Sequence, residues 1–185
     1  VLSHFSYTFE KGFIYGITAP SGTGKTTLLN LIGNILKPAQ GEIETDFKTG
    51  IAYVFQEPEL LSQLTIAENI ALPLATYLKK EIAFEQAISI LQKMELGGFE
   101  NRFPNELSFG QQQRAAIARA LTYPSPLLLM DEPFKGLDEA LSRRIIKRIR
   151  ERQTENGQTI LFTSHNPGEL RLFADKTVRL DPTSH

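Results

Sequence analysis

Three short stretches of the sequence carry side chains that could bind or cleave a phosphorylated substrate. The first, Ala19-Pro-Ser-Gly-Thr-Gly-Lys-Thr26, lies between an apolar run and a helix-like run. Its glycines allow backbone N–H groups to turn toward an anion, and the following helix directs its positive end to the same point. The pattern predicts a nucleoside triphosphate site in which Lys25 reaches the β- and γ-phosphates and the Thr26 hydroxyl ligates Mg²⁺.

The second stretch is a pair of acids at the end of a short apolar run, Leu127 to Met130. Acids at the carboxyl end of a buried parallel strand face the crevice in which ligands bind. With the glycine-rich loop upstream, Asp131 is expected to help hold Mg²⁺, and Glu132 is placed to orient or deprotonate an attacking water. His165 follows another apolar strand, 159–163, and its place in the same sheet favours a position facing phosphate.

The third stretch, Leu107-Ser-Phe-Gly-Gln-Gln-Gln-Arg114, precedes a run of strong helix formers. Ser108 and Gln111 fit the S-x-x-Q pattern of a capping box, which marks a helix N-terminus. A helix N-terminus is a ready anion site, so this stretch predicts a second place for a phosphate. A well-capped helix without a ligand is an equally good interpretation of the local pattern.

The composition favours one soluble globular domain. The chain has 185 residues, of which 41% are hydrophobic and 22% charged, and no cysteine, which excludes disulfides and thiolate metal sites. The net charge of −1 gives no pull toward nucleic acid or anionic lipid, and the basic helix expected at 138–153 is interpreted as a solvated face. No apolar run approaches the roughly 20 residues that cross a bilayer.

Strands and helices must alternate to position these residues. Short apolar or alternating runs predict strands at 2–9, 13–18, 41–44, 50–55, 127–130, 159–163 and 177–180. Helical periodicity and capping signals predict helices at 25–37, 65–78, 82–96, 115–121, 138–153 and 170–174. Thr65 and Glu68 form a second expected capping box, and Ile35 is expected to face the core together with Leu28 and Leu29.

The order of these pieces resembles the ATP-binding cassette ATPases, the nucleotide-binding subunits of ABC transporters. The resemblance covers essentially the whole chain and rests on the glycine-rich loop, Gln56, LSFGQQQR, LLLMDEP, GLD at 136–138 and TSH at 163–165. The LSxGQ pattern is the most specific of these motifs, because other P-loop classes lack it. The resemblance implies an α/β P-loop fold, with a mainly parallel sheet flanked by helices, a small reduced antiparallel β-subdomain and an inserted helical subdomain.

The resemblance also implies a division of the chain and a role for each matching residue. One domain spans 1–185, with 1–57 and 115–185 as the RecA-like core and β-subdomain, and about 58–114 as the helical subdomain with the signature motif. The catalytic residues are expected to be Glu132 as the base, His165 at the γ-phosphate and Gln56 near the water. The metal is expected at Thr26, Gln56 and Asp131. The expected nucleotide-binding residues are Ala19, Pro20, Ser21, Gly22, Thr23, Gly24, Lys25, Thr26, Thr27, Ser108, Gly110, Gln111 and Asp138.

Three positions depart from the pattern of the family. Ala19 stands in place of the first glycine of the loop, and Phe109 in place of the third residue of LSGGQ. The aromatic residue that stacks on adenine in the family is expected ahead of Val1. Phe5 and Tyr7 are too close to the loop for that role and are expected in a strand core.

The function implied is that of an ATP-binding and ATP-hydrolysing subunit, with ATP and Mg²⁺ bound. It would power solute transport through separate transmembrane permease subunits, as a homodimer on the cytoplasmic face of the membrane, and no nucleic acid partner is expected. The alternative is a non-transport ATPase of the same type that acts as a nucleotide-driven dimerisation switch on another macromolecule. A third reading, a switch with little turnover, is opposed by the presence of Glu132 and His165. The transported solute and the direction of transport stay open.

Overall fold

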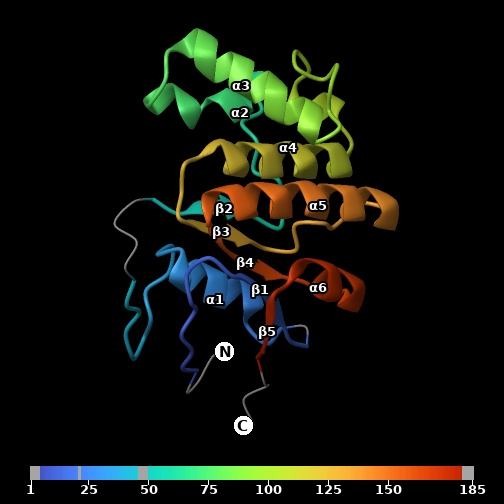
Figure 1. Ribbon diagram of the computed structural model, residues 1–185. Coiled ribbons are helices and arrows are strands. Elements are labelled where there is room, and N and C mark those ends of the chain that lie inside the picture. Colours follow the sequence, from blue (N-terminus) through green and yellow to red (C-terminus); the bar gives the residue numbers. More distant parts are fainter. Residues whose placement is uncertain (1–4, 21, 46–49, 181–185) are drawn as a thin grey trace. The chain divides into compact units, whose positions relative to one another are not determined.

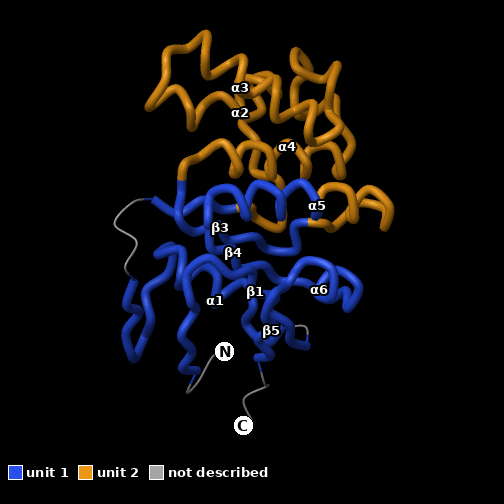
Figure 2. The backbone as a smooth tube through the Cα atoms, viewed as in Figure 1, with its two compact units in different colours: residues 1–53, 125–133, 146–185 blue, residues 54–124, 134–145 orange. Residues whose placement is uncertain are grey.

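The computed structural model describes residues 5–20, 22–45 and 50–180, and these form two compact units. Figure 2 shows one unit built from 1–53, 125–133 and 146–185, and the other built from 54–124 and 134–145. The chain passes between the units several times, so each unit combines segments that are distant in the sequence.

A five-stranded sheet has the order β2-β3-β4-β1-β5 (Figure 1). The strands are β1 (Ile14–Thr18), β2 (Ala52–Val54), β3 (Leu127–Met130), β4 (Thr159–Thr163) and β5 (Lys176–Arg179). The pairs β1–β4, β1–β5 and β3–β4 are parallel. Every residue of β3 and β4 is buried, which explains why both strands are continuous apolar runs in the sequence. The carboxyl ends of β1, β3 and β4 therefore meet at one edge of the sheet.

The helices among the described residues fall partly in one unit and partly in the other. They are α1 (Lys25–Ile32), α2 (Ile66–Ala71), α3 (Lys80–Lys93), α4 (Phe109–Thr122), α5 (Glu139–Asn156) and α6 (Pro167–Phe173), with short 3₁₀ turns at Leu74–Thr76 and Pro104–Glu106. No helix in the described part of the chain is both long enough and apolar enough to cross a bilayer.

Two helices cover opposite faces of β1 in the first unit. Helix α1 buries Leu29 in one apolar cluster with Tyr15 and Ile17. Gly16 points to the other face, where a Cβ would stand 2.6 Å from Leu170 Cδ2 of α6. The glycine therefore allows α6 to pack directly against the strand.

The second unit has its own helical core. Helices α2, α3 and α4 bury apolar side chains that include Ile70, Leu91 and Ile117. The capping box predicted at Thr65 and Glu68 is confirmed, because the Glu68 amide donates to Thr65 Oγ1 and the Thr65 amide donates to Glu68 Oε2. The burial of these side chains stabilises the packing of the three helices on one another.

The structure differs from the sequence-based expectation at two helices. Helix α1 ends at Ile32, because Asn34 has a left-handed φ of 57° and its amide donates to Leu31 O instead of continuing the helical pattern. Ile35 is 52% exposed instead of facing the core. The helix expected at 65–78 is broken into α2 and a 3₁₀ turn. Pro73, which has no amide hydrogen to donate, lies at the break.

The structure also differs in the strands expected at 2–9 and 41–44. Among the described residues, 5–9 and 41–45 belong to no strand, and the sheet contains no antiparallel hairpin from this region. Residues 2–4 of the first expected strand and the residues expected in the turn, 46–49, lie outside the described residues. Phe5 and Tyr7 are 37% and 44% exposed, so they are not core residues. Two short strands with little apolar cover gain too little from pairing to outweigh the entropy of ordering them.

Candidate functional site

The glycine-rich loop connects the carboxyl end of β1 to the first turn of α1. Gly24 is the N-cap of α1 with φ 101°, a conformation that side chains with a Cβ rarely adopt, and no side chain caps this helix. The amide groups of the first turn of α1 are thus left for a ligand. Because the helix dipole also places positive charge at this end, the loop can receive an anion.

The Lys25 side chain folds back over the loop from the first position of α1. Its Nζ donates to Ala19 O at 3.0 Å and to Pro20 O at 3.4 Å, and the residue is 7% exposed. Ala19 is not among the residues with positive φ, so an alanine is tolerated where the family pattern has a glycine. Thr23 Oγ1 donates to Pro20 O at 2.7 Å, which closes the turn, and Ser21 lies outside the described residues.

Asp131 lies at the end of β3 and is almost fully buried, with 2% exposure. Its Oδ2 accepts a hydrogen bond from Thr26 Oγ1 at 2.6 Å, and its Oδ1 accepts one from Thr163 Oγ1 at 2.6 Å. A carboxylate and a hydroxyl are the hard oxygen ligands that Mg²⁺ prefers, so this pair fits the ion. Both residues join the site from segments more than a hundred residues apart.

Glu132 and His165 are in contact just after the ends of β3 and β4. His165 Nε2 lies 2.9 Å from Glu132 Oε1, and the two side chains are 45% and 24% exposed, respectively. The backbone of Glu132 is left-handed, with φ 45°, and its amide donates to Thr163 Oγ1 at 2.9 Å. An acid and a histidine in contact, partly open to solvent, can hold a water molecule and accept its proton.

The sequence interpretation gave no role to four residues around this pair, which are Thr163, Ser164, Asn166 and Glu169. Thr163 contacts both acids, and Ser164 Oγ donates to Glu169 Oε2 at 2.5 Å, while the Asn166 amide donates to Ser164 Oγ at 3.0 Å. Burial, together with the nearby Glu132 charge, raises the pKa of Glu169 above its usual range. The hydroxyls at 163 and 164 stand directly before His165, and that adjacency is the signal that could have identified them.

The signature stretch forms the first turn of α4 in the second unit. The Ser108 amide donates to Gln111 Oε1 at 2.9 Å, and the Gln111 amide donates to Ser108 Oγ at 3.4 Å, which confirms the predicted capping box. A Cβ on Gly110 would lie 2.6 Å from Gly136 O, so the helix start and the 134–138 loop are in close contact. The glycine at 110 is therefore required by packing.

Two further predicted residues lie in the second unit. Asp138 Oδ1 accepts a hydrogen bond from the Leu141 amide at 2.9 Å and so caps the start of α5. Gln56 is half-buried and follows strand β2. The carbonyls of Pro58 and Glu59 are held by Arg119, whose Nη atoms donate at 3.4 Å and 2.8 Å. These bonds fix the backbone that follows Gln56.

The predicted site residues therefore separate into two groups. The structure brings together the glycine-rich loop, Thr26, Asp131, Glu132 and His165 within the first unit, at the carboxyl edge of the sheet. The residues expected at the other end of the nucleotide belong to the second unit: Gln56, Ser108, Gly110, Gln111 and Asp138.

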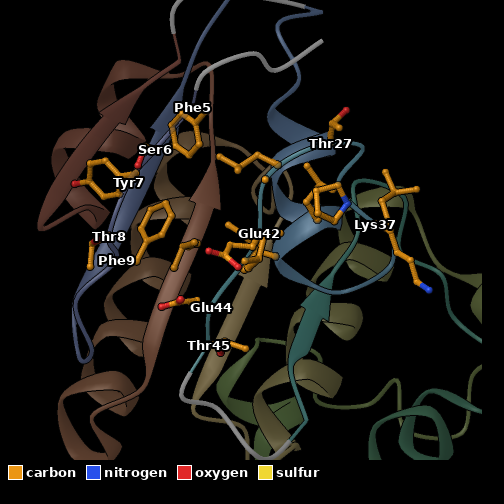
Figure 3. Close-up of a pocket in the computed structure, with 18 of the residues that line it drawn as sticks. Phe5, Ser6, Tyr7, Thr8, Phe9, Thr27, Lys37, Glu42, Glu44 and Thr45 are labelled. Carbon is orange, nitrogen blue, oxygen red and sulfur yellow. The ribbon is translucent and has the colours of Figure 1, made fainter.

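A groove of about 1180 Å³ lies beside α1 in the first unit. Figure 3 shows Phe5, Tyr7 and Phe9 along one side of it and Thr27 and Lys37 along the other. The Phe5 and Tyr7 rings are stacked, with centroids 6.4 Å apart. Thr27, a predicted nucleotide-binding residue, thus joins the glycine-rich loop to an aromatic-lined hollow.

Comparisons with known proteins identify the family. The model of the ABC transporter family matches residues 2–135. Thiamine import ATP-binding proteins ThiQ from Shigella flexneri serotype 5b (strain 8401) and Escherichia coli O157:H7 are each 38% identical to this chain over an alignment of 184 residues. The alignment covers 94% of this chain and 79% of each relative.

Solved structures agree with this similarity. A dimeric post-hydrolysis state of the ATP-binding cassette MJ0796 bound to ADP and Pi superposes with a TM-score of 0.87 at 33% identity, over 96% of this chain and 86% of that chain. Another dimeric structure of MJ0796, a bacterial ABC transporter cassette, gives 0.88 at 33% identity, over 95% and 84% of the two chains. The alternative of an ATPase outside transport is not favoured by these relatives. With the phosphate loop, the buried acid and the signature helix all present, the chain belongs to the ABC transporter family and is an ATP-binding, ATP-hydrolysing subunit of such a transporter.

Proposed function

We propose that the two groups of predicted residues are the two halves of an ATP site that is completed by a second copy of this chain. The observation that carries the proposal is the Glu132–His165 contact of 2.9 Å at the same sheet edge as the glycine-rich loop. A base at this edge would lie beside the position that we propose for the γ-phosphate. The nucleotide-binding residues are those predicted from the sequence, with 19–27 in one copy and Ser108, Gly110, Gln111 and Asp138 in the other.

The loop binds the phosphates through donor groups that are already oriented for an anion in the absence of a ligand. The amides at the start of α1 have no side-chain cap, so they can donate to phosphate oxygens. Lys25 exchanges its bonds to Ala19 O and Pro20 O for the β- and γ-phosphates. The ammonium group is satisfied in both states, so binding leaves no buried charge without a partner.

Thr26 and Asp131 are proposed to hold Mg²⁺, with Gln56 as the third predicted ligand. The ion supplies positive charge that neutralises the phosphate oxygens during hydrolysis. Asp131 can turn its Oδ2 from the Thr26 hydroxyl toward the ion, while its Oδ1 stays bonded to Thr163.

Glu132 is proposed as the general base, and His165 as the residue that senses the γ-phosphate. The carboxylate accepts the proton of the attacking water, and the imidazole can leave Glu132 to donate to the phosphate. Because both side chains are partly exposed, water reaches them without any movement of the strands.

The second copy is proposed to supply the N-terminus of α4. Ser108 is exposed at that end of the helix, and the MJ0796 cassettes in the solved structures are dimeric. An ATP held between the loop of one copy and the signature helix of the other would join the two chains. Hydrolysis removes the contacts of the γ-phosphate and so favours separation.

The ATP-driven pair is proposed to act on transmembrane permease subunits at the cytoplasmic face of the membrane. In this proposal, 1–57 and 115–185 form the catalytic core, and about 58–114 form the helical subdomain that carries the signature. The region from Gln56 to Ile66 would receive the partner. The ThiQ relatives are named for thiamine import, which supports import as the direction of transport here.

The proposal is tested by replacing the base. We expect Glu132→Gln to lower steady-state hydrolysis by about 10²- to 10⁴-fold, because general base catalysis is lost, and to leave ATP binding intact. The variant should also accumulate as an ATP-bound dimer on size-exclusion chromatography. Glu151→Gln is the matched control, since Glu151 is an exposed acid on α5 that lies 3.9 Å from Lys147. Native turnover by Glu132→Gln would show that Glu132 is not the base.

A further inference from the structure

One buried hydroxyl stands between the two acids of the site. Thr163 is the last residue of β4 and has 0% exposure. Its Oγ1 donates to Asp131 Oδ1 at 2.6 Å and accepts the Glu132 amide at 2.9 Å. A threonine hydroxyl has one proton to give, so its donor capacity is fully used on the Asp131 carboxylate. The same oxygen thus connects the side chain of one acid with the backbone of the next.

The hydrogen bond from the Glu132 amide to Thr163 Oγ1 lies at a residue with an unfavourable backbone conformation. Glu132 has φ 45°, a left-handed conformation that is sterically unfavourable for a residue with a Cβ and persists only when its surroundings hold it. The Thr163 hydroxyl holds the amide of this residue. The direction in which Glu132 leaves the chain, toward His165, therefore depends on a hydroxyl on the neighbouring strand.

The contact to Asp131 divides the carboxylate between two partners. Oδ1 is occupied by Thr163, and Oδ2 faces Thr26 at 2.6 Å. When Oδ2 changes partner, the bond to Oδ1 prevents the side chain from rotating. The metal ligand and the base are then kept at a constant separation.

We propose that Thr163 is a positioning residue for ATP hydrolysis, which fixes Asp131 and Glu132 relative to each other through one hydroxyl. The proposal rests on the proposed role of Glu132 as the base. A simpler role, in which the hydroxyl only satisfies buried polar groups, would affect stability without a specific effect on turnover.

The test compares Thr163→Val, which keeps the shape and removes the hydroxyl, with Thr163→Ser, which keeps the hydroxyl. We expect kcat to fall by about tenfold to a hundredfold in Thr163→Val with KM for ATP within about threefold, because misplacing a base by 1 Å costs rates of that order. Thr163→Ser should stay within about threefold of the native kcat. Thr159→Val is the control, since Thr159 is a buried threonine at the other end of β4 whose Oγ1 accepts the Gly12 amide, at 2.9 Å, and contacts neither acid among the described bonds. It should retain the native kcat.

A second readout does not depend on hydrolysis. Hydrogen exchange of the Glu132 amide, followed by NMR in protein without nucleotide or Mg²⁺, should be slow in the native chain and in Thr163→Ser. It should be faster by roughly tenfold or more in Thr163→Val. A native kcat in Thr163→Val, or an unprotected Glu132 amide in the native chain, would overturn the proposal. Native turnover by Glu132→Gln would count against the base itself, and the exchange comparison would still decide whether Thr163 holds the two acids.

Discussion

The two helix N-termini proposed to bind ATP are built in opposite ways. Helix α1 begins at Gly24 with no side-chain cap, so its first amides are open to a ligand. Helix α4 begins at Ser108 with a complete capping box, so one of its first amides and the Ser108 amide are already satisfied by the chain itself. The comparison indicates that the first end offers all its leading amides to an anion, whereas at the second end the cap already uses one amide and the Ser108 hydroxyl.

The glycines at the two ends also serve different needs. Gly24 provides a backbone conformation, with φ 101°, that lets the chain turn into the helix. Gly110 is not among the glycines with positive φ, and it provides space, because a Cβ would meet Gly136 O at 2.6 Å. One end is shaped for a ligand, and the other is shaped by its contact with the loop at 134–138.

The largest effect on ATP binding should come from the uncapped N-terminus of α1. Lys25→Ala removes the ammonium group that is proposed to bind two phosphates, and we expect ATP affinity of the separate chain to fall by roughly a hundredfold, as for loss of a buried charge-assisted contact. Ser108→Ala should leave that affinity within about threefold, because the signature end contributes only after a second copy binds. Isothermal titration at protein concentrations below dimerisation measures both. Equal losses in the two variants would remove the distinction between the ends.

A smaller effect is expected from crowding the contact beneath α4. Gly110→Ala should lower the free energy of unfolding by about 1–3 kcal/mol, because the added methyl group meets a backbone carbonyl that cannot rotate away. Gly97→Ala is the control, since its Cβ would meet only Gln92 Cγ, at 3.9 Å. Chemical denaturation compares the two variants. If Gly110→Ala had the native free energy of unfolding, the 134–138 loop would be able to move away from the added methyl group at little cost.

The smallest effect should come from opening the cap itself. Gln111→Ala removes the acceptor of the Ser108 amide, and we expect a loss of about 0.5–1 kcal/mol in the free energy of unfolding. The Ser108 hydroxyl would still accept the Gln111 amide, so α4 should keep its start. Thermal unfolding followed by circular dichroism provides the measurement. A loss well above 2 kcal/mol in the free energy of unfolding would show that the Gln111 side chain stabilises more of the structure than the N-terminus of α4.

Local patterns predicted those parts of the structure that depend on local chemistry. The buried strands at 127–130 and 159–163 and both capping boxes are confirmed, because apolar runs and cap residues determine them over a few positions. Helix ends were less predictable. Helix α1 stops at Ile32 and not at Lys37, because Asn34 takes a left-handed conformation with φ 57°, a stop that the apolar periodicity did not reveal.

The residues that were missed depend on contacts between distant segments. Thr163 lies 32 positions from Asp131 in the sequence, and only the pairing of β3 with β4 brings the two together. The strands expected at 2–9 and 41–44 failed for a related reason, since alternation of side chains cannot show whether a partner strand is available. The roles assigned to the site residues stay predictions until the variants are measured.

The left-handed backbone at Glu132 also limits which substitutions this position can accept. Four non-glycine residues in the described part of the chain have positive φ, and Glu132 is the one that lies two positions after a buried strand. Branching at Cβ is disfavoured in that conformation, so valine, isoleucine and threonine should be rare in any collection of folded variants, whatever their activity. Asparagine, aspartate and glycine suit the backbone but shorten or remove the acid. In a saturation library, position 132 would therefore be selected both for folding and for catalysis. Glutamine would separate the two, because it keeps the length and backbone preference of glutamate and lacks the carboxylate.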